Sequence, residues 1–229
     1  MRDLLRPATL RAGVVYGVLI TCLVAPQIMA YVDAAAEHGI LIFSGGMIAA
    51  SLLCQTLAGL VLFGWGGRAP LPGLFRDRSE TLRGAGVSLL VALVIGGVML
   101  LLDPSLKQAA LDGKFDYTVA IKFPDTVWGG VRLILWQLGM SSLLLTAAAL
   151  VYFVRLSGRV GLSLAVVVVA QGLISAQQLE GFSVSAAFWG VLLIGMISRL
   201  LSCLLFLRFG LVGPVVFGVV VASRVFLAL

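Results

Sequence analysis

Residues 141–160 read SSLLLTAAALVYFVRLSGRV, an apolar run interrupted by Ser141, Ser142 and Thr146 and closed by Arg155 and Arg159. Such a run suits the hydrocarbon core of a bilayer, and its arginines suit the headgroup region. The whole chain shares this character, because 61% of its residues are hydrophobic, 11% are charged and the mean hydropathy is +1.12. So little polar surface cannot cover a water-soluble core. The sequence therefore predicts an integral membrane protein.

The apolar runs predict a bundle of about seven transmembrane helices in one all-α domain over residues 1–229. A helix needs about 20 apolar residues to cross roughly 30 Å of hydrocarbon, and the runs have that length. A closed barrel would instead show short segments of alternating hydrophobicity, which the sequence lacks. The predicted spans are 12–32, 39–63, 84–102, 129–154, 162–179, 185–207 and 210–228.

The charges between the spans predict the orientation. The N-terminus and the even-numbered loops hold ten arginines and three acids, whereas the odd-numbered loops hold three lysines and seven acids. By the positive-inside rule, the N-terminus is expected in the cytoplasm and the C-terminus outside, in a multi-pass protein of the prokaryotic cytoplasmic (inner) membrane. The net charge of +6 follows from this topology, so no nucleic-acid partner is expected.

Two loops are long enough to make contacts of their own. The cytoplasmic loop, residues 64–83, mixes arginines with Leu71, Leu74, Phe75 and Leu82. It is expected either to lie in the headgroup region with these side chains dipped into the bilayer, or to be a solvated loop.

The outer loop, residues 103–128, predicts a short helix over PSLKQAALDG followed by a strand. In the strand, apolar residues alternate with others at the period of two that is typical of a half-buried strand. A lone strand leaves its edges unpaired, so it needs the membrane surface, the rest of the loop or another chain as a cover. The apolar positions are Phe115, Tyr117, Val119, Ile121 and Phe123.

Ionisable groups inside the membrane are functional candidates, and this chain has few. Arg199 lies nine residues before Arg208, well inside a predicted span, and no Asp or Glu lies at that depth. It is expected to face a cavity, carbonyl oxygens, a lipid phosphate or the acid of a partner protein. Arg132 and Arg224 lie near the outer boundary, where their side chains can reach the interface.

The residues for catalysis, metal binding or proton coupling are missing from the predicted spans. No carboxylate lies deep enough for proton coupling. His38 is the only histidine, which leaves no second imidazole for a metal site or a proton relay. Cys22, Cys54 and Cys203 form no C-x-x-C pair and are expected to be small buried packing residues. The sequence predicts no enzyme and no cofactor.

Small residues recur inside the spans at the spacing that lets helix backbones approach closely. They predict a compact bundle, or one that packs on neighbouring proteins. Gly13 with Gly17, Gly45 with Ala49 and Gly46 with Ala50 have this spacing, and Gly96–Gly97 and Gly129–Gly130 add adjacent glycines within the spans.

Four stretches of the C-terminal half carry a family resemblance. They are SSLLLT at residues 141–146, VRLSGRVG after it, LISAQ at 173–177 and FLRFGLVGPVVFGVVVA at the end. Their order and spacing resemble the CPBP intramembrane proteases, also called the CAAX protease or Abi family. That family has E-E-x-x-x-R, a basic turn, F-x-x-x-H, and a histidine with an asparagine four residues later. At those positions this chain has Ser141, Ser142, Thr146, Gln177, Gly218 and Ala222.

The resemblance implies a relative that has lost catalysis. The glutamates of the family activate water with help from histidine, and serine has no base strength near neutral pH. The chain is therefore expected to be an accessory or scaffold subunit, with membrane lipids and another integral membrane protein as partners. The alternatives are a carrier or channel for a small solute or lipid, using Gln171, Gln177 and Arg199, and a CPBP-type protease that takes catalytic groups from a partner.

Overall fold

The computed structural model describes residues 3–37, 39, 41, 43–67, 71, 73–111, 126–139, 144–176 and 186–227. Within these residues the chain forms eight α-helices and a 3-10 helix, with no strand, so the all-α prediction is confirmed there. The helices are α1 Pro7–Glu37, α2 Ser44–Trp65, α3 Arg78–Leu111, α5 Val127–Gly139, α6 Leu144–Ser157, α7 Val160–Ala176, α8 Ala186–Phe209, α9 Val212–Ser223 and η1 Arg224–Leu227.

Four helical segments are long and apolar enough to cross a membrane: Pro7–Glu37, Ser44–Trp65, Arg78–Leu101 and Leu192–Phe209. Their apolar surface is mostly turned outward, since only 22% to 33% of each apolar window is buried inside the protein. An all-helical membrane protein is the class that the composition predicts. The other described α-helices are apolar but shorter, and the number of seven spans stays a prediction.

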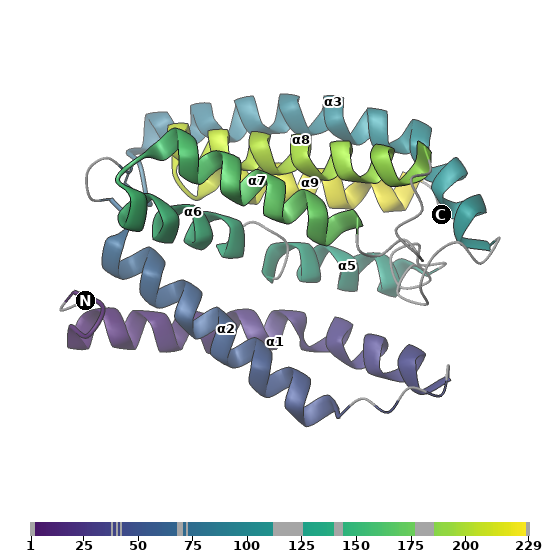
Figure 1. Cartoon of the computed structure of the whole chain (residues 1–229), viewed down its shortest axis with the longest axis horizontal. Coiled ribbons are helices and arrows are strands. Elements are labelled where there is room, and N and C mark those ends of the chain that lie inside the picture. Colours follow the sequence, from purple (N-terminus) through teal and green to yellow (C-terminus); the bar gives the residue numbers. More distant parts are fainter. Residues whose placement is uncertain are drawn as a thin grey trace.

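The helices lie roughly alongside one another, with α1 and α2 as an antiparallel hairpin on one side (Figure 1). The hairpin packs on the rest of the bundle through α1 against α5 and α2 against α6. Beyond α6, α7 packs on α8, and α9 packs on both α3 and α8. One end of the bundle holds the starts of α1, α3, α7 and α9 and the ends of α2, α6 and α8 (Figure 1).

Close packing of the α1–α2 hairpin depends on glycines that the sequence marked as packing residues. A Cβ atom at Gly13 would lie 2.6 Å from Cδ2 of Leu60, and one at Gly17 would lie 2.9 Å from Cα of Thr56. On the facing helix, a Cβ atom at Gly59 would lie 3.1 Å from Cα of Gly13. The predicted small-residue packing is therefore confirmed within the chain for Gly13 and Gly17.

The core is centred on α6. Leu150, Val151 and Val154 are at most 1% exposed and belong to one cluster with Leu62 of α2 and Phe206 of α8. Spacings of one, three and four residues place the three α6 side chains on one face of that helix. Residues 150–154 of the apolar run 141–160 thus lie at the centre of the helix packing.

Two predicted elements differ from the structure in extent. The single predicted span 129–154 contains two described helices, α5 and α6, which point in the same direction in Figure 1. The predicted separate helix of the outer loop is the last part of α3, which runs past Pro104 to Leu111. The predicted strand from Phe115 to Phe123 lies outside the described residues.

Candidate functional site

Arg199 lies on α8, on the face that turns into the bundle. Cys203, one turn further along, is 1% exposed and belongs to the central core cluster. One turn earlier, Met196 packs against Gly172 of α7, where a Cβ atom would lie 3.3 Å from the methionine sulfur. Nine residues separate Arg199 from Arg208 at the end of α8, which corresponds to about 14 Å along the helix axis. The structure thus places this cation deep within α8, as the sequence predicts.

Of the helices that pack on α8, only α3 carries carboxylates among the described residues. α8 packs on α7, α9, α3 and α6. Residues 127–176 and 186–227 contain no Asp or Glu, and α3 carries Glu80 in its first turn and Asp103 beyond its apolar segment Arg78–Leu101. An intramembrane arginine is stabilised by polar or anionic groups of the chain, of a lipid or of a partner protein. This is the most distinctive charge inside the bundle.

Arg132 lies on α5, and Arg224 is the first residue of η1, which packs on α5. The Arg224 Nη1 donates a hydrogen bond to the Val221 carbonyl oxygen at 3.0 Å, which satisfies a carbonyl at the end of α9. The Nε atom of Arg132 is buried and has no hydrogen-bond partner among the described residues. A contact of Arg132 with a partner or lipid stays a prediction.

The positions that resemble the protease motifs are partly described. Thr146 is 1% exposed on α6, Ala222 is 2% exposed on α9, and Gly218 is partly buried. Ser141, Ser142 and Gln177 lie outside the described residues. α6 packs on α2, α7 and α8, whereas α9 packs on α3, α5 and α8. Thr146 and Ala222 therefore lie on two helices that share α8 as a neighbour.

Neutral polar side chains are buried in the layer formed by α1, α2 and α6. Gln55 is fully buried, and Thr21, Gln27 and Ser51 are each 5% exposed. Oγ1 of Thr21, Oγ of Ser51 and Oγ1 of Thr146 have no hydrogen-bond partner among the described residues. Such groups can hold water or a small polar solute, and they offer no acid or base for catalysis. Within the described part of the chain, no group of His, Cys, Asp and Glu could hold a metal ion.

The loop between α2 and α3 is tied to the bundle. Leu71 is 7% exposed inside the central cluster, and Leu74 packs against that cluster. The backbone N–H of Leu211, in the α8–α9 turn, donates to the Leu74 carbonyl oxygen at 2.9 Å. Insertion of Leu71 and Leu74 into the bilayer is therefore a wrong prediction, because both have partners inside the protein. Phe75 and Leu82 are 72% and 64% exposed and remain available to the membrane.

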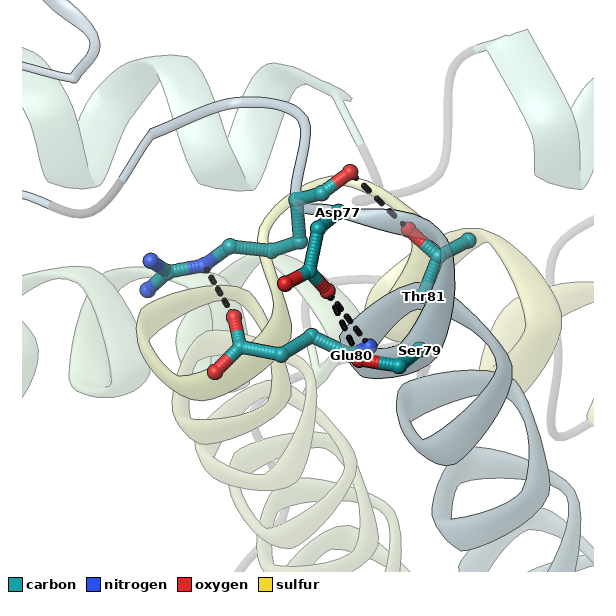
Figure 2. Close-up of polar contacts among 5 residues, drawn as sticks. Asp77, Ser79, Glu80 and Thr81 are labelled. Carbon is teal, nitrogen blue, oxygen red and sulfur yellow. Dashed lines mark hydrogen bonds and ion pairs between the residues drawn. The ribbon is translucent and has the colours of Figure 1, made fainter.

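The loop ends in a hydrogen-bonded start of α3 (Figure 2). Asp77 Oδ1 accepts the backbone N–H of Glu80 at 2.8 Å and the Ser79 hydroxyl at 3.1 Å. These two hydrogen bonds stabilise the charged carboxylate and lower the pKa of Asp77 below its ordinary value. The Thr81 hydroxyl donates to the Arg76 carbonyl oxygen at 3.3 Å, and Arg76 Nε lies 3.6 Å from Glu80 Oε2. The spacing D-x-x-E at Asp77 is a helix-start signal that the sequence analysis missed.

The surface of α2 presents a row of small residues. Gly46, Ala50 and Cys54 are exposed and follow one another at intervals of four residues, so they share one face of the helix. A Cβ atom at Gly45 would meet nothing within 4 Å, and one at Gly46 would be 3.8 Å from the Phe43 Cβ. The prediction of buried cysteines is thus wrong for Cys54 and also for Cys22, which is exposed, and it is confirmed for Cys203.

The chain matches no family model, no curated protein and no solved structure. The resemblance to the CPBP proteases accordingly rests on the sequence stretches alone.

Proposed function

We propose that this chain is a non-catalytic accessory or scaffold subunit that binds another integral membrane protein in the prokaryotic inner membrane. In this proposal the arginine-rich end of the bundle faces the cytoplasm and the C-terminus lies outside. The chain crosses the bilayer seven times, with α5 and α6 sharing one crossing.

The observation that carries the proposal is the contrast between two classes of glycine. Gly13, Gly17 and Gly59 have neighbouring chain atoms where a Cβ would be, so their lack of a side chain serves contacts within the chain. A Cβ atom at Gly45 would meet no atom within 4 Å, and one at Gly46 would meet only the Phe43 Cβ, at 3.8 Å. The small face of α2 that includes Gly46, Ala50 and Cys54 therefore serves no close helix contact in the described structure.

A face of small side chains has no advantage when its neighbour is lipid. Lipid tails are as apolar as leucine, so helices associate in membranes by close packing, for which small residues leave room. Glycine is also less favourable than alanine in a helix, by up to about 1 kcal/mol in the interior, and Gly45 and Gly46 lie in the first turn of α2. A partner helix that packs closely on this face would offset that loss by van der Waals contact.

The test is purification of the tagged chain from its native membrane in mild detergent, followed by mass spectrometry of what stays bound. We expect a membrane protein in fixed stoichiometry with the wild-type chain. The double variant Gly46→Leu with Ala50→Leu should lose it, because the larger side chains keep the partner backbone away. Ala170→Leu, at an exposed position on α7, is the matched control and should keep it. A partner retained by the double variant contradicts the proposed face.

A carrier for a small uncharged solute is the second candidate, favoured by the buried polar side chains of α1, α2 and α6. The purified chain reconstituted in liposomes would then transport a solute, and Gln55→Leu would reduce uptake because Gln55 is fully buried in that layer. A stable monomer or homo-oligomer from the native membrane, with no bound partner, would favour this candidate over the subunit.

A further inference from the structure

We propose that the start of α3 and the neighbouring end of α8 form a binding site for the phosphate headgroups of anionic lipids. The surface consists of Phe75, Arg78, Leu82, Arg83 and Arg208, and is called the α3 platform below. All five side chains are exposed.

The two arginines of α3 continue helix faces that are apolar and exposed. Arg78 precedes Leu82 by one turn, and Leu89 and Leu93 follow on the same face, with Leu82 64% and Leu93 56% exposed. Arg83 likewise precedes Leu90, which is 66% exposed. One turn of helix is about 5.4 Å long, so each guanidinium lies about a turn or two beyond side chains that suit acyl chains. This is the arrangement of charge and apolar surface that a lipid headgroup and its tails require.

α8 brings a third arginine to this corner. A Cβ atom at Gly84 would lie 2.7 Å from the Phe209 Cβ, so α3 and α8 touch there. Arg83 and Arg208 are the chain neighbours of these two residues. The guanidinium carbon of Arg208 lies 5.8 Å from the centre of the Phe209 ring, which keeps the Arg208 side chain near the contact. The α3 platform therefore contains arginines from two helices.

The nearby acids do not neutralise these arginines. Asp77 uses Oδ1 as the cap of α3, and Glu80 pairs with Arg76. Among the described residues, Arg78, Arg83 and Arg208 form no ion pair with a carboxylate. A guanidinium binds phosphate through two parallel hydrogen bonds, and its charge is attracted to an anionic surface. Lipid phosphate is thus the partner that complements the platform in charge and in depth.

The loop before the platform is held in place by the protein. The hydrogen bond from Leu211 to Leu74 and the burial of Leu71 fix the backbone beside Phe75. Phe75 is 72% exposed although its neighbours pack inward. An aromatic ring held at this position can dip into the boundary between headgroups and acyl chains, so a lipid meets a surface that is already formed.

The test is native mass spectrometry of the purified full chain with phosphatidylglycerol or phosphatidylcholine at equal concentration. We expect phosphatidylglycerol to bind preferentially. The triple variant Arg78→Gln, Arg83→Gln and Arg208→Gln should bind it about tenfold or more weakly, because three cations are removed. The matched control is Arg155→Gln with Arg159→Gln, two exposed arginines at the same end of the bundle, and it should keep nearly all the binding. An equal loss in the control, or equal binding of the two lipids, overturns the proposal.

Three further measurements test the proposal if the glutamine variant does not fold. The conservative variant with lysine at the three positions keeps the charge and should retain the preference for phosphatidylglycerol. Phe75→Trp, in a background in which the four native tryptophans are replaced by phenylalanine, should show fluorescence quenched by brominated lipids, and an unquenched tryptophan contradicts the platform. Displacement of the lipid by millimolar inorganic phosphate would assign the site to a soluble anion and also overturn the proposal. None of these assays involves a partner protein, so they succeed or fail independently of the subunit proposal.

Discussion

Gly17 is a residue at which a single methyl group is expected to disturb the fold. A Cβ atom there would collide with the Thr56 hydroxyl and lie 2.9 Å from the Thr56 Cα, which is backbone and cannot rotate away. We expect Gly17→Ala to destabilise the protein by about 1–3 kcal/mol, the usual range for overpacking. Thermal unfolding in detergent measures the change. Gly97→Ala is the control, because a Cβ atom there meets nothing within 4 Å and alanine favours a helix.

Gly210 combines a left-handed backbone with a close contact. Its φ is +70°, and a Cβ atom would lie 2.5 Å from the Leu74 carbonyl oxygen that accepts the Leu211 N–H. Gly158 has φ +66° at the end of α6, and a Cβ atom there meets nothing within 4 Å. We expect Gly158→Ala to lower the free energy of unfolding by about 1–2 kcal/mol, the cost of the backbone conformation alone. Gly210→Ala should lower it by about 1–3 kcal/mol more, since the loop must also move. Equal losses at the two positions in denaturant unfolding would contradict the loop contact.

At the scale of the elements, the stability of the first turn of α3 depends on pH. Hydrogen bonds from Glu80 and Ser79 lower the pKa of Asp77, so the folded state favours the charged carboxylate. The stabilisation is therefore complete above the ordinary pKa of about 3.8 and is lost as the pH falls through the lower value of the folded protein. We expect the melting temperature of wild type to fall over that acid range more than that of Asp77→Asn, whose amide oxygen still caps the helix. Asp77→Ala should be less stable than Asp77→Asn at pH 7. Identical pH profiles for wild type and Asp77→Asn would contradict this role.

The boundaries of elements show what a hydropathy pattern can and cannot predict. It locates α1, α2, α7 and α8, because a continuous apolar run must be helical in lipid. It places a break at Pro104, since proline cannot donate to the helix ladder, yet α3 continues to Leu111. It also merges α5 and α6, because an apolar segment has the same composition whether it is one helix or two. Such boundaries depend on packing between distant parts of the chain.

Some of the candidate sites could be predicted from the sequence, and others could not. Arg199 could be predicted, because one charge in an apolar run is visible without a structure. The inward packing of Leu71 and Leu74 could not, since a leucine in a basic loop is equally suited to a bilayer or to a protein core. The α3 platform likewise requires the contact between Gly84 and Phe209, which are 125 positions apart in the sequence.

At the scale of the whole molecule, the described arginines of the loops gather at one end of the bundle. That end holds the starts of α1, α3 and α7 and the ends of α6 and α8 in Figure 1. Arg6, Arg78, Arg155, Arg159 and Arg208 lie in or beside these helix ends. The charge asymmetry counted along the sequence is therefore also an asymmetry in space, which the positive-inside rule reads as the cytoplasmic side.

The prediction that tests this topology concerns α5 and α6. They contain 13 and 14 residues, so each is only about 20 Å long and too short to cross roughly 30 Å of hydrocarbon alone, whereas α9 continues as η1 so that the two together span residues 212–227. Both α5 and α6 point the same way in Figure 1, so together they can make one crossing. We then expect single cysteines placed before Pro7 and beside Arg159 to be labelled from the cytoplasm by a membrane-impermeant maleimide, in a background without Cys22, Cys54 and Cys203. A cysteine added after Leu229 should be labelled only from outside. Labelling of both chain ends from the cytoplasm would mean that α5 and α6 enter and leave on one side, and that the chain makes an even number of crossings.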